Sequence, residues 1–342
     1  MLFEKTPGDA QALLPVPIKE LGLKLEGSPI EGYVEQLFKE MQAKGLEHFR
    51  PAFYLTSEWG CPSEEPVIGV PFYLADKRIG AIESAVNDIE DEREIMMYMR
   101  HEAGHAFNYA YELYKTDEWR ELFGPFRRPY RDRYRFVPFS RNYVRHIAGW
   151  YAQKHPDEDF AETFAVWLTP RSKWREKYKN WPAMKKLRYV DHVCHELGPV
   201  PPLRALGETD FTVEDMEETI EDFYRDSAPD ESQALADLAL DVDLDDIFLD
   251  PDQVNPERVK KASEVVVEHR KEIVDKVSYW TGARRSIVKT LLEAVVKRVD
   301  EMGLVVDKSR ESEQIVELTV YITTLTMNFF SARRFPRKTT NA

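Results

Sequence analysis

The first long stretch with helical periodicity begins after Ser28. This serine is followed by a proline and, three positions later, by a glutamate, which is the pattern of an N-cap and a first helical turn. Apolar residues then recur every three or four positions as far as Gly45, where the pattern stops. The sequence therefore predicts an amphipathic helix between these two residues.

Two short runs of β-branched and aromatic residues follow this helix. They cover residues 52–55 and 67–74, and a connection rich in glycine, proline and serine separates them. Pro71 falls inside the second run and cannot donate a hydrogen bond to a neighbouring strand. We expect two strands, the second of which is interrupted at Pro71 or lies at a sheet edge.

The longest helix is predicted to begin at Asn87 and to end near Tyr114. Asn87 is a suitable N-cap, and Glu90 follows it three positions later. The side of this helix that faces the core is expected to carry Ile95, Met99, Ala103, Ala106 and Ala110.

Further helices are predicted later in the chain. One begins at Pro156 and ends before Pro170, and an amphipathic helix over residues 182–197 stops at a glycine that is followed by prolines. Residues 256–330 again show helical spacing of apolar positions. The proline group after residue 197 marks the best candidate for a domain boundary.

These elements predict an α+β fold that is predominantly helical. A length of 342 residues suffices for more than one domain. We divide the chain into a first domain over residues 1–205, an acidic connector over residues 206–255, and a C-terminal helical domain over residues 256–342 that ends in a basic tail.

The negative charge of the chain is concentrated in one segment. The formal net charge is −14, but residues 208–252 hold 18 Asp and Glu and one Arg, a local charge of −17, so the remaining residues sum to about +3. Acidity is thus a property of this segment and not of the whole surface.

The composition is that of a soluble globular protein, which we expect in the cytoplasm and without membrane contact. The chain begins with charges and prolines where a secretory signal would be apolar, and no apolar run is long enough to span a bilayer. Cys61 and Cys194 are far apart and neither has a Cys-x-x-Cys partner, which fits a reducing compartment.

The sequence His-Glu-Ala-Gly-His at residues 101–105 is the strongest chemical signal in the chain. On a helix His101 and His105 point the same way, so both imidazoles can bind one ion. Glu102 is rotated off that face and can accept a proton from a water molecule on the metal. Gly104 leaves space for another backbone to approach. Because the pattern also arises by chance, it predicts a zinc site only if a third ligand exists.

A second pair of residues at helical spacing supplies the candidate third ligand. Glu158 and Glu162 lie four positions apart on the helix predicted from Pro156, among apolar residues. Burial of two carboxylates without a cation is costly, and a divalent metal together with imidazole N–H groups would offset that cost. We interpret Glu158 as the third ligand and Glu162 as the carboxylate that orients a ligand histidine, although the two roles could be exchanged. The alternative is a solvated acidic helix face.

Together these motifs resemble the gluzincin arrangement, in which HExxH and a downstream Glu-x-x-Ala-(Asp/Glu) helix hold one zinc ion. The resemblance is closer to a bacterial family of zinc-binding metallopeptidases that show HExGH, an E-L-F-G stretch and Y-A-x-x-H-P-x-E-D-x-A-E-T, which correspond here to residues 101–105, 121–124 and 151–163. It covers about residues 90–170. The resemblance implies a zincin-like fold and peptidase activity, and it says nothing about the acidic segment or the C-terminal helices.

Two residues of the same motif are candidates for stabilising the oxyanion that forms when water adds to a carbonyl group. His155 and Tyr151 precede the ligand helix and stand in the matching motif, while Tyr143 and His146 lie close by in the sequence. The alternative is structural: His155 caps its helix and Tyr151 packs in the core. The sequence leaves both interpretations open.

Residues 119–146 contain eight arginines with interleaved aromatic residues, a composition typical of nucleic-acid binding. The acidic balance of the chain and the lack of a nucleic-acid-binding motif argue against that function. We favour a wall or lid of a cleft, whose arginines meet a carboxylate of the substrate. A further hypothesis is that the acidic residues 208–252 fold back on this basic segment and gate the cleft, or bind a partner; the alternative is a solvated linker.

The sequence therefore predicts a zinc-dependent metallopeptidase that acts on a peptide or protein substrate. One Zn²⁺ would be bound by two histidines and Glu158, with Glu102 as general base and with the substrate held along an edge strand at residues 67–74. Two alternatives are a zinc-dependent amidohydrolase acting on a small or modified peptide, and a non-catalytic protein that keeps zinc for stability and binds a partner. The carboxylate of Glu102 favours an enzyme, because structural zinc sites are closed by four protein ligands.

Overall fold

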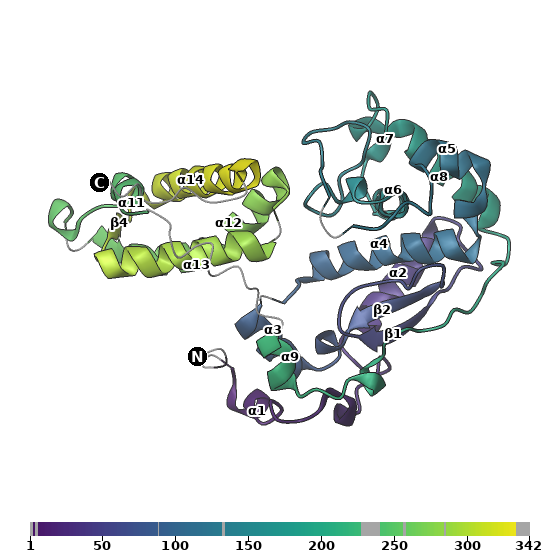
Figure 1. Cartoon of the computed structure of the whole chain (residues 1–342), viewed down its shortest axis with the longest axis horizontal. Helices are drawn as coiled ribbons and strands as arrows, with labels where there is room; N and C mark the ends of the chain where they lie inside the picture. Colours follow the sequence, from purple (N-terminus) through teal and green to yellow (C-terminus); the bar gives the residue numbers. More distant parts are fainter. Residues whose placement is uncertain are drawn as a thin grey trace. The chain divides into compact units, whose positions relative to one another are not determined.

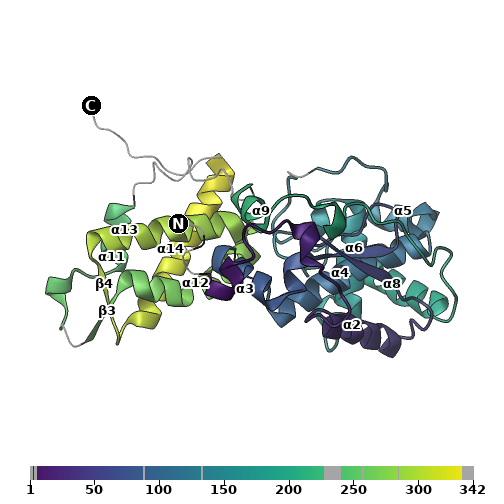
Figure 2. The same cartoon turned by 90° about the horizontal axis from the view of Figure 1, so that it is seen from below.

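The computed structural model describes residues 3, 6–87, 89–131, 134–226, 240–255, 258–283 and 285–332. The chain divides into two compact units, Met1–Ala228 and Pro229–Ala342. Helices account for most of the described residues, and two small sheets accompany them (Figures 1 and 2). The predicted α+β, predominantly helical class is therefore confirmed. None of the described helices is long and apolar enough to cross a membrane.

The first unit begins with short helices and a two-stranded sheet. Its early elements are α1 (Gly8–Gln11), η1 (Ile18–Leu21), α2 (Glu31–Ala43), β1 (Ala52–Thr56), β2 (Val67–Pro71), η2 (Phe72–Leu74) and α3 (Lys77–Val86). The strands are parallel, with Ala52 opposite Val67. Gly60 adds an isolated bridge to Gly69 on the other edge of β2. Pro71 ends the second strand, which is therefore shorter than predicted, because proline cannot continue the ladder.

Two helices form the centre of the first unit. α4 (Glu92–Ala110) and α6 (Pro156–Leu168) pack against each other, and α4 also contacts β2 on its other side (Figure 1). Asp91 and Glu94 form a capping box at the start of α4, so the predicted start at Asn87 is wrong. A separate helix, α3, precedes it.

Gly104 sets the distance between α4 and α6. A Cβ atom at this position would lie 2.8 Å from Ala161 Cα, 3.0 Å from Ala161 O and 3.1 Å from Phe164 Cβ. Two of these atoms belong to the backbone of α6 and cannot move alone. The sequence-based expectation that Gly104 allows another backbone to approach is thus confirmed.

The other helices of the first unit follow α4 along the chain. They are η3 (Leu113–Lys115), α5 (Asp117–Phe123), η4 (Tyr151–Gln153), α7 (Trp174–Lys177), α8 (Met184–Leu197), η5 (Val213–Asp215) and α9 (Ile220–Asp226). α5 and α8 both contact α6. These helices extend the hydrophobic core of this unit, which includes residues of α4 and α6.

The first part of the acidic segment belongs to the first unit. The Ile18 N–H donates to Glu218 O at 3.0 Å, and the Ile220 N–H donates to Val16 O at 3.2 Å. Four apolar residues of this part are buried in the core, namely Val213, Met216, Ile220 and Tyr224. The predicted boundary at residue 205 and the predicted connector over 206–255 therefore differ from the division at residue 228, because apolar residues between the acidic ones anchor the chain.

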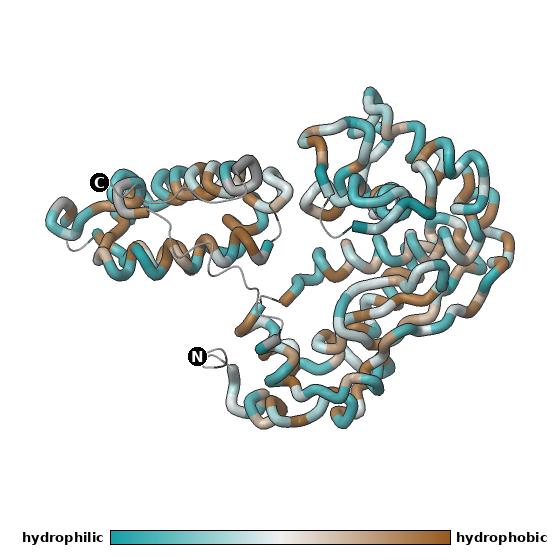
Figure 3. Tube along the Cα trace, viewed as in Figure 1, coloured by the Kyte–Doolittle hydropathy of each residue, from teal (hydrophilic) through white to brown (hydrophobic). Residues whose placement is uncertain are grey.

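The second unit has a core of its own. Its elements are α11 (Asp241–Ile247), η6 (Pro251–Gln253), β3 (Val259–Lys261), α12 (Ala262–Thr281), α13 (Arg285–Met302), β4 (Val305–Asp307) and α14 (Glu311–Ala332). Hydrophobic and hydrophilic residues alternate along α12 and α13 with helical spacing (Figure 3). The short antiparallel pair β3–β4 was not predicted. Leu244 and Phe248, from the second part of the acidic segment, are buried in this core.

Replacement of Gly104 by alanine is expected to destabilise the protein by about 1–2 kcal/mol. Overpacking against backbone atoms costs about 1–3 kcal/mol, which exceeds the gain of up to about 1 kcal/mol from removing a helical glycine. Gly32→Ala in α2 is the matched control, because its Cβ would meet nothing within 4 Å; it should stabilise the protein slightly. Chemical denaturation measures both, and a stabilising Gly104→Ala would contradict the close approach.

Candidate metal centre

The candidate centre lies between α4 and α6. α4 contributes His101 and His105, and α6 contributes Glu158 and Glu162; each of the four residues is at most 7% exposed. α6 carries its acidic residues in and just after its first turn, where the helix dipole favours negative charge. The structure thus brings together the two residue pairs that helical spacing had singled out.

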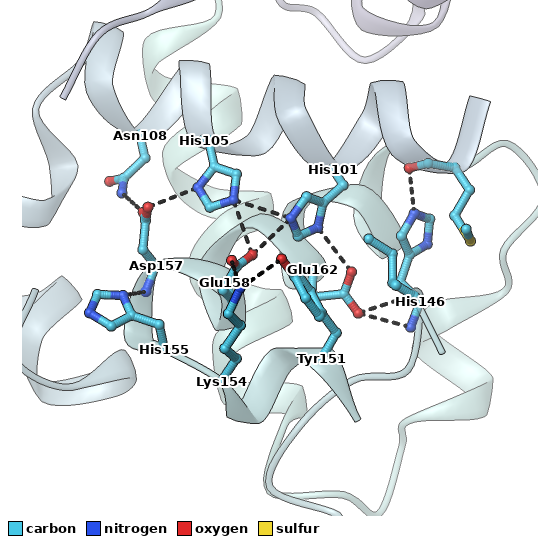
Figure 4. A network of polar contacts seen from close by, with 12 residues as sticks. His101, His105, Asn108, His146, Tyr151, Lys154, His155, Asp157, Glu158 and Glu162 are labelled. Carbon is cyan, nitrogen blue, oxygen red and sulfur yellow. Dashed lines mark hydrogen bonds and ion pairs between the residues drawn. The ribbon is translucent and has the colours of Figure 1, made fainter. Parts of the chain in front are cut away.

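Three side-chain atoms converge on one point (Figure 4). Glu158 Oε2 lies 2.9 Å from His101 Nε2 and 3.2 Å from His105 Nε2, and the two nitrogens are 3.1 Å apart. Within the part of the chain that the structure describes, these residues form the one group of His, Cys, Asp or Glu with metal-ligand spacing. Their separations are close to those on one face of a tetrahedron whose centre lies about 2 Å from each atom.

A carboxylate orients each histidine from the opposite side of its ring. Glu162 Oε1 accepts a hydrogen bond from His101 Nδ1 at 3.0 Å, and its Oε2 accepts the backbone N–H groups of His146 and Ile147. Glu162 is therefore fixed by three donors. It holds the His101 ring with Nε2 directed at the point of convergence.

Asp157 has the same function for His105. Its Oδ2 accepts from His105 Nδ1 at 2.9 Å and from the Tyr109 hydroxyl, and its Oδ1 accepts from Asn108 Nδ2 at 2.8 Å. Both imidazoles therefore donate through Nδ1. Their Nε2 lone pairs are left to face each other and Glu158 (Figure 4).

This donor set fits a zinc ion. Two nitrogen lone pairs and a carboxylate oxygen, buried and facing one another, require a proton or a cation between them. Histidine nitrogen and carboxylate oxygen are common zinc ligands, and three protein ligands leave a fourth position open for water or substrate. The residues present thus match a catalytic type of zinc site.

The electrostatics of the cluster also favour a bound cation. Burial disfavours the charged imidazolium, but the carboxylates of Glu158 and Glu162 outweigh it and raise the pKa of His101 to about 9. Burial also opposes ionisation of Glu158, yet hydrogen bonds from both histidines lower the pKa of this carboxyl to about 2. The cluster therefore favours positive charge between its carboxylates. Metal binding supplies such charge and releases protons.

Glu102 lies beside the three converging atoms without bonding to them. It is 6% exposed and lines the adjacent cavity, and among the described residues no group donates a hydrogen bond to its carboxylate. Burial raises its pKa, while His101 and His105 act in the opposite direction. A carboxylate in this position can take a proton from a water molecule in the cavity.

A cavity of about 540 Å³ opens next to the centre, a volume typical of small-molecule sites. Segments 58–64, 126–130 and 151–158 contribute to its lining. β2 is fully buried and does not line it. Residues 67–74 thus do not line this cavity, because Gly60 pairs with Gly69 at that edge of β2, and substrate binding along them stays a prediction.

Tyr151 reaches the cavity from η4. Its ring centroid lies 5.5 Å from that of His101, and burial raises the pKa of its hydroxyl. Gly149 and Trp150 precede it with φ values of 89° and 56°. A left-handed tryptophan is strained, and such residues cluster at functional sites. This turn leads the chain into η4 beside the centre.

His155 also lines the cavity, but both of its ring nitrogens have structural partners. Nδ1 accepts the Asp157 N–H at 3.2 Å as the N-cap of α6, and Nε2 donates to Arg128 O at 2.7 Å. The structural alternative for His155 thus accounts for its whole ring. His146 likewise donates from Nε2 to Met97 O, and Tyr143 does not line the cavity.

Sequence reasoning missed two residues of the site. Asp157 was considered only as part of the motif, although it precedes Glu158 directly and its partner His105 lies on the same helix face as Asn108. Lys154 was not considered; its Nζ lies 4.0 Å from Glu158 Oε1. The sequence held one signal for this role of Asp157. It lies four residues before Ala161, so the two residues share the face of α6 that packs against α4.

The basic and acidic segments have separate partners in the described residues. Arg127 and Arg128 line the cavity, as a wall of a cleft would. In the acidic segment, Glu217 pairs with Lys19 at 3.0 Å, and other members bond within unit 1. Contact between residues 208–252 and 119–146 stays a prediction, and residues 227–239 lie outside the described part of the chain.

Comparison with known proteins identifies one related family. Residues 81–179 match the model of a family described as "Putative zinc-binding metallo-peptidase". This match includes both helices of the centre and confirms the resemblance to zinc-binding metallopeptidases. No curated protein and no solved structure matches the chain.

Asp157→Asn is expected to weaken zinc binding by about 10- to 100-fold, because the amide is a poorer acceptor for His105 Nδ1–H. Competition with a chromophoric chelator measures the affinity. Asp191→Asn is the control, since this carboxylate accepts from Trp167 Nε1 and Arg175 and contacts neither histidine of the centre. Equal zinc affinity in the two variants would contradict the orienting role.

Proposed function

We propose that the chain is a zinc-dependent peptidase that hydrolyses a peptide bond. One observation carries this proposal: three ligand atoms converge beside a buried carboxylate, Glu102, that has no hydrogen-bond donor among the described residues and faces a cavity. The match of residues 81–179 to a metallopeptidase family supports the same conclusion.

Each residue of the centre has a role in this reaction. One zinc ion, bound by His101, His105 and Glu158, would act as a Lewis acid that polarises the substrate carbonyl and makes water more acidic. Glu102 accepts the proton of the attacking water and delivers it to the leaving amine. Two histidines on one helix and a glutamate on a second helix resemble the gluzincin arrangement.

Tyr151 is the candidate for stabilising the negative charge that develops on the carbonyl oxygen. Its side chain borders the centre and the cavity, and a hydroxyl there can donate a hydrogen bond to the oxyanion. His155 was an equal candidate from the sequence, but its ring caps α6 and bonds to Arg128 O. We therefore assign this role to Tyr151 and not to His155.

The features of the site argue against a purely structural zinc. Structural zinc is normally enclosed by four protein ligands, whereas here three ligand atoms adjoin a cavity. A carboxylate next to the ligands would add only a desolvation cost in a structural site. An amidohydrolase of small or modified peptides would use the same residues, and its substrates would distinguish it.

Glu102→Gln is expected to retain one zinc ion per chain and to lower kcat by about 100- to 10,000-fold, the usual contribution of a general base. The amide preserves the shape of the side chain but cannot accept the proton of water. Elemental analysis of the purified protein gives the zinc content, and cleavage of a diverse peptide library, which includes N-terminally modified peptides, gives the activity.

Glu94→Gln is the matched control on the same helix. Glu94 belongs to the capping box at the start of α4, and glutamine is also suitable there. This variant should keep wild-type zinc content and activity. Absence of zinc from the wild type would overturn the proposal, and so would equal cleavage by the wild type and Glu102→Gln.

A further inference from the structure

We infer that Lys154 is a further catalytic residue, which stabilises the oxyanion together with Tyr151. This inference rests on the proposed function and extends it to a residue that the family motif leaves unspecified. It follows from the position of the ammonium group, from the side chains that hold it, and from the chemistry that the reaction requires at that point.

The ammonium group of Lys154 lies at the metal centre. Its Nζ is 3.4 Å from the Tyr151 hydroxyl and 4.0 Å from Glu158 Oε1, and the residue lines the cavity (Figure 4). Glu158 uses its other oxygen, Oε2, toward the two histidines. Lys154 and Tyr151 thus present a cation and a hydroxyl next to each other, beside the point where the ligand atoms converge.

Two aromatic rings hold the lysine in place. Nζ lies 4.7 Å from the ring centroid of Tyr130 and 5.1 Å from that of Tyr151, and its side chain is 17% exposed. Cation–π attraction to these rings favours this position of the ammonium group. A lysine already held in this way loses little further rotamer entropy when a substrate arrives. Its charge is therefore preorganised.

This position suits the charge that hydrolysis creates. When water adds to the peptide carbonyl, the π electrons move onto the carbonyl oxygen, and Glu102 takes the proton that the water loses. Donors already aimed at this oxygen stabilise the transition state more than the neutral ground state. Lys154 and Tyr151 donate hydrogen bonds there and keep their protons. When the C–N bond breaks, the charge collapses back and Glu102 delivers its proton to the amine.

A structural ion pair is the competing explanation. In that case Lys154 would only neutralise Glu158 and thereby support the ligand. The separation of 4.0 Å is long for a hydrogen-bonded ion pair, and the Glu158 carboxyl already has two histidine partners. The two explanations differ in what they predict: a structural lysine affects zinc affinity, whereas a catalytic one affects kcat and the binding of oxyanions.

The test replaces Lys154 by methionine in the full-length, zinc-loaded protein. We expect kcat to fall about 100-fold, as for the loss of one oxyanion donor, with KM and zinc content unchanged. Lys154→Arg should recover part of the activity. Titration calorimetry with inorganic phosphate, a tetrahedral oxyanion, gives a measurement without turnover, and Lys154→Met should weaken phosphate binding about 10-fold.

Lys44→Met is the control for loss of a stacked lysine. Its Nζ lies 4.8 Å from the ring centroid of Trp167, and Lys44 does not line the cavity; this variant should keep activity and phosphate affinity.

Unchanged kcat in Lys154→Met beside an active wild type would overturn the inference and leave the proposed function intact. Loss of zinc from Lys154→Met would overturn it in favour of the structural pair. If the wild type cleaves no peptide, the proposed function fails, and unchanged phosphate affinity in Lys154→Met would overturn the inference as well.

Discussion

The burial of two imidazoles and three carboxylates between α4 and α6 is the constraint on which the rest of this unit depends. Such a cluster is unfavourable unless each group has a partner and positive charge lies between the carboxylates. Glu162 and Asp157 satisfy the Nδ1–H groups of the two histidines, and Glu158 faces both Nε2 atoms. The close contact of the helices at Gly104 makes these distances possible. The hydrogen bonds of these buried groups and the close packing of the two helices therefore have to form together.

The surrounding elements serve to keep one side of this cluster accessible. α6 begins at the cluster, with His155 as its cap, so that the preceding η4 can bring Tyr151 and Lys154 to the cavity. Trp59, which also lines the cavity, donates from Nε1 to Glu90 at 3.2 Å and stacks on Tyr98. The segment before β2 is thus held by side chains as well as by its bridge to Gly69. Rigid helices position the ligands, and shorter segments shape the space in front of them.

The acidic segment shows that charge alone is a weak guide to domain boundaries. Composition suggested a solvated connector, yet its apolar residues decide where it lies. Ile220 and Tyr224 anchor its first part in the core of unit 1, and Leu244 and Phe248 anchor its last part in the core of unit 2. Among the described acidic residues beside these anchors, Glu217 and Asp245 are exposed, as expected for short segments with one apolar face.

Local periodicity determined a large part of this protein from the sequence alone. Helical spacing made it possible to predict α2, α4, α6 and α8, and to place His101 with His105 and Glu158 with Glu162 on common helix faces, because residues four positions apart share a face of any α-helix. The rotation and axial offset between α4 and α6 lie outside such patterns. Only the tertiary structure therefore decided that Glu158 faces the Nε2 atoms, that Asp157 orients His105, that the ring of His155 is used as a cap, and that residues 58–64 replace residues 67–74 at the cavity. These outcomes depend on contacts between residues distant in the sequence, whose geometry is set by packing of the whole core.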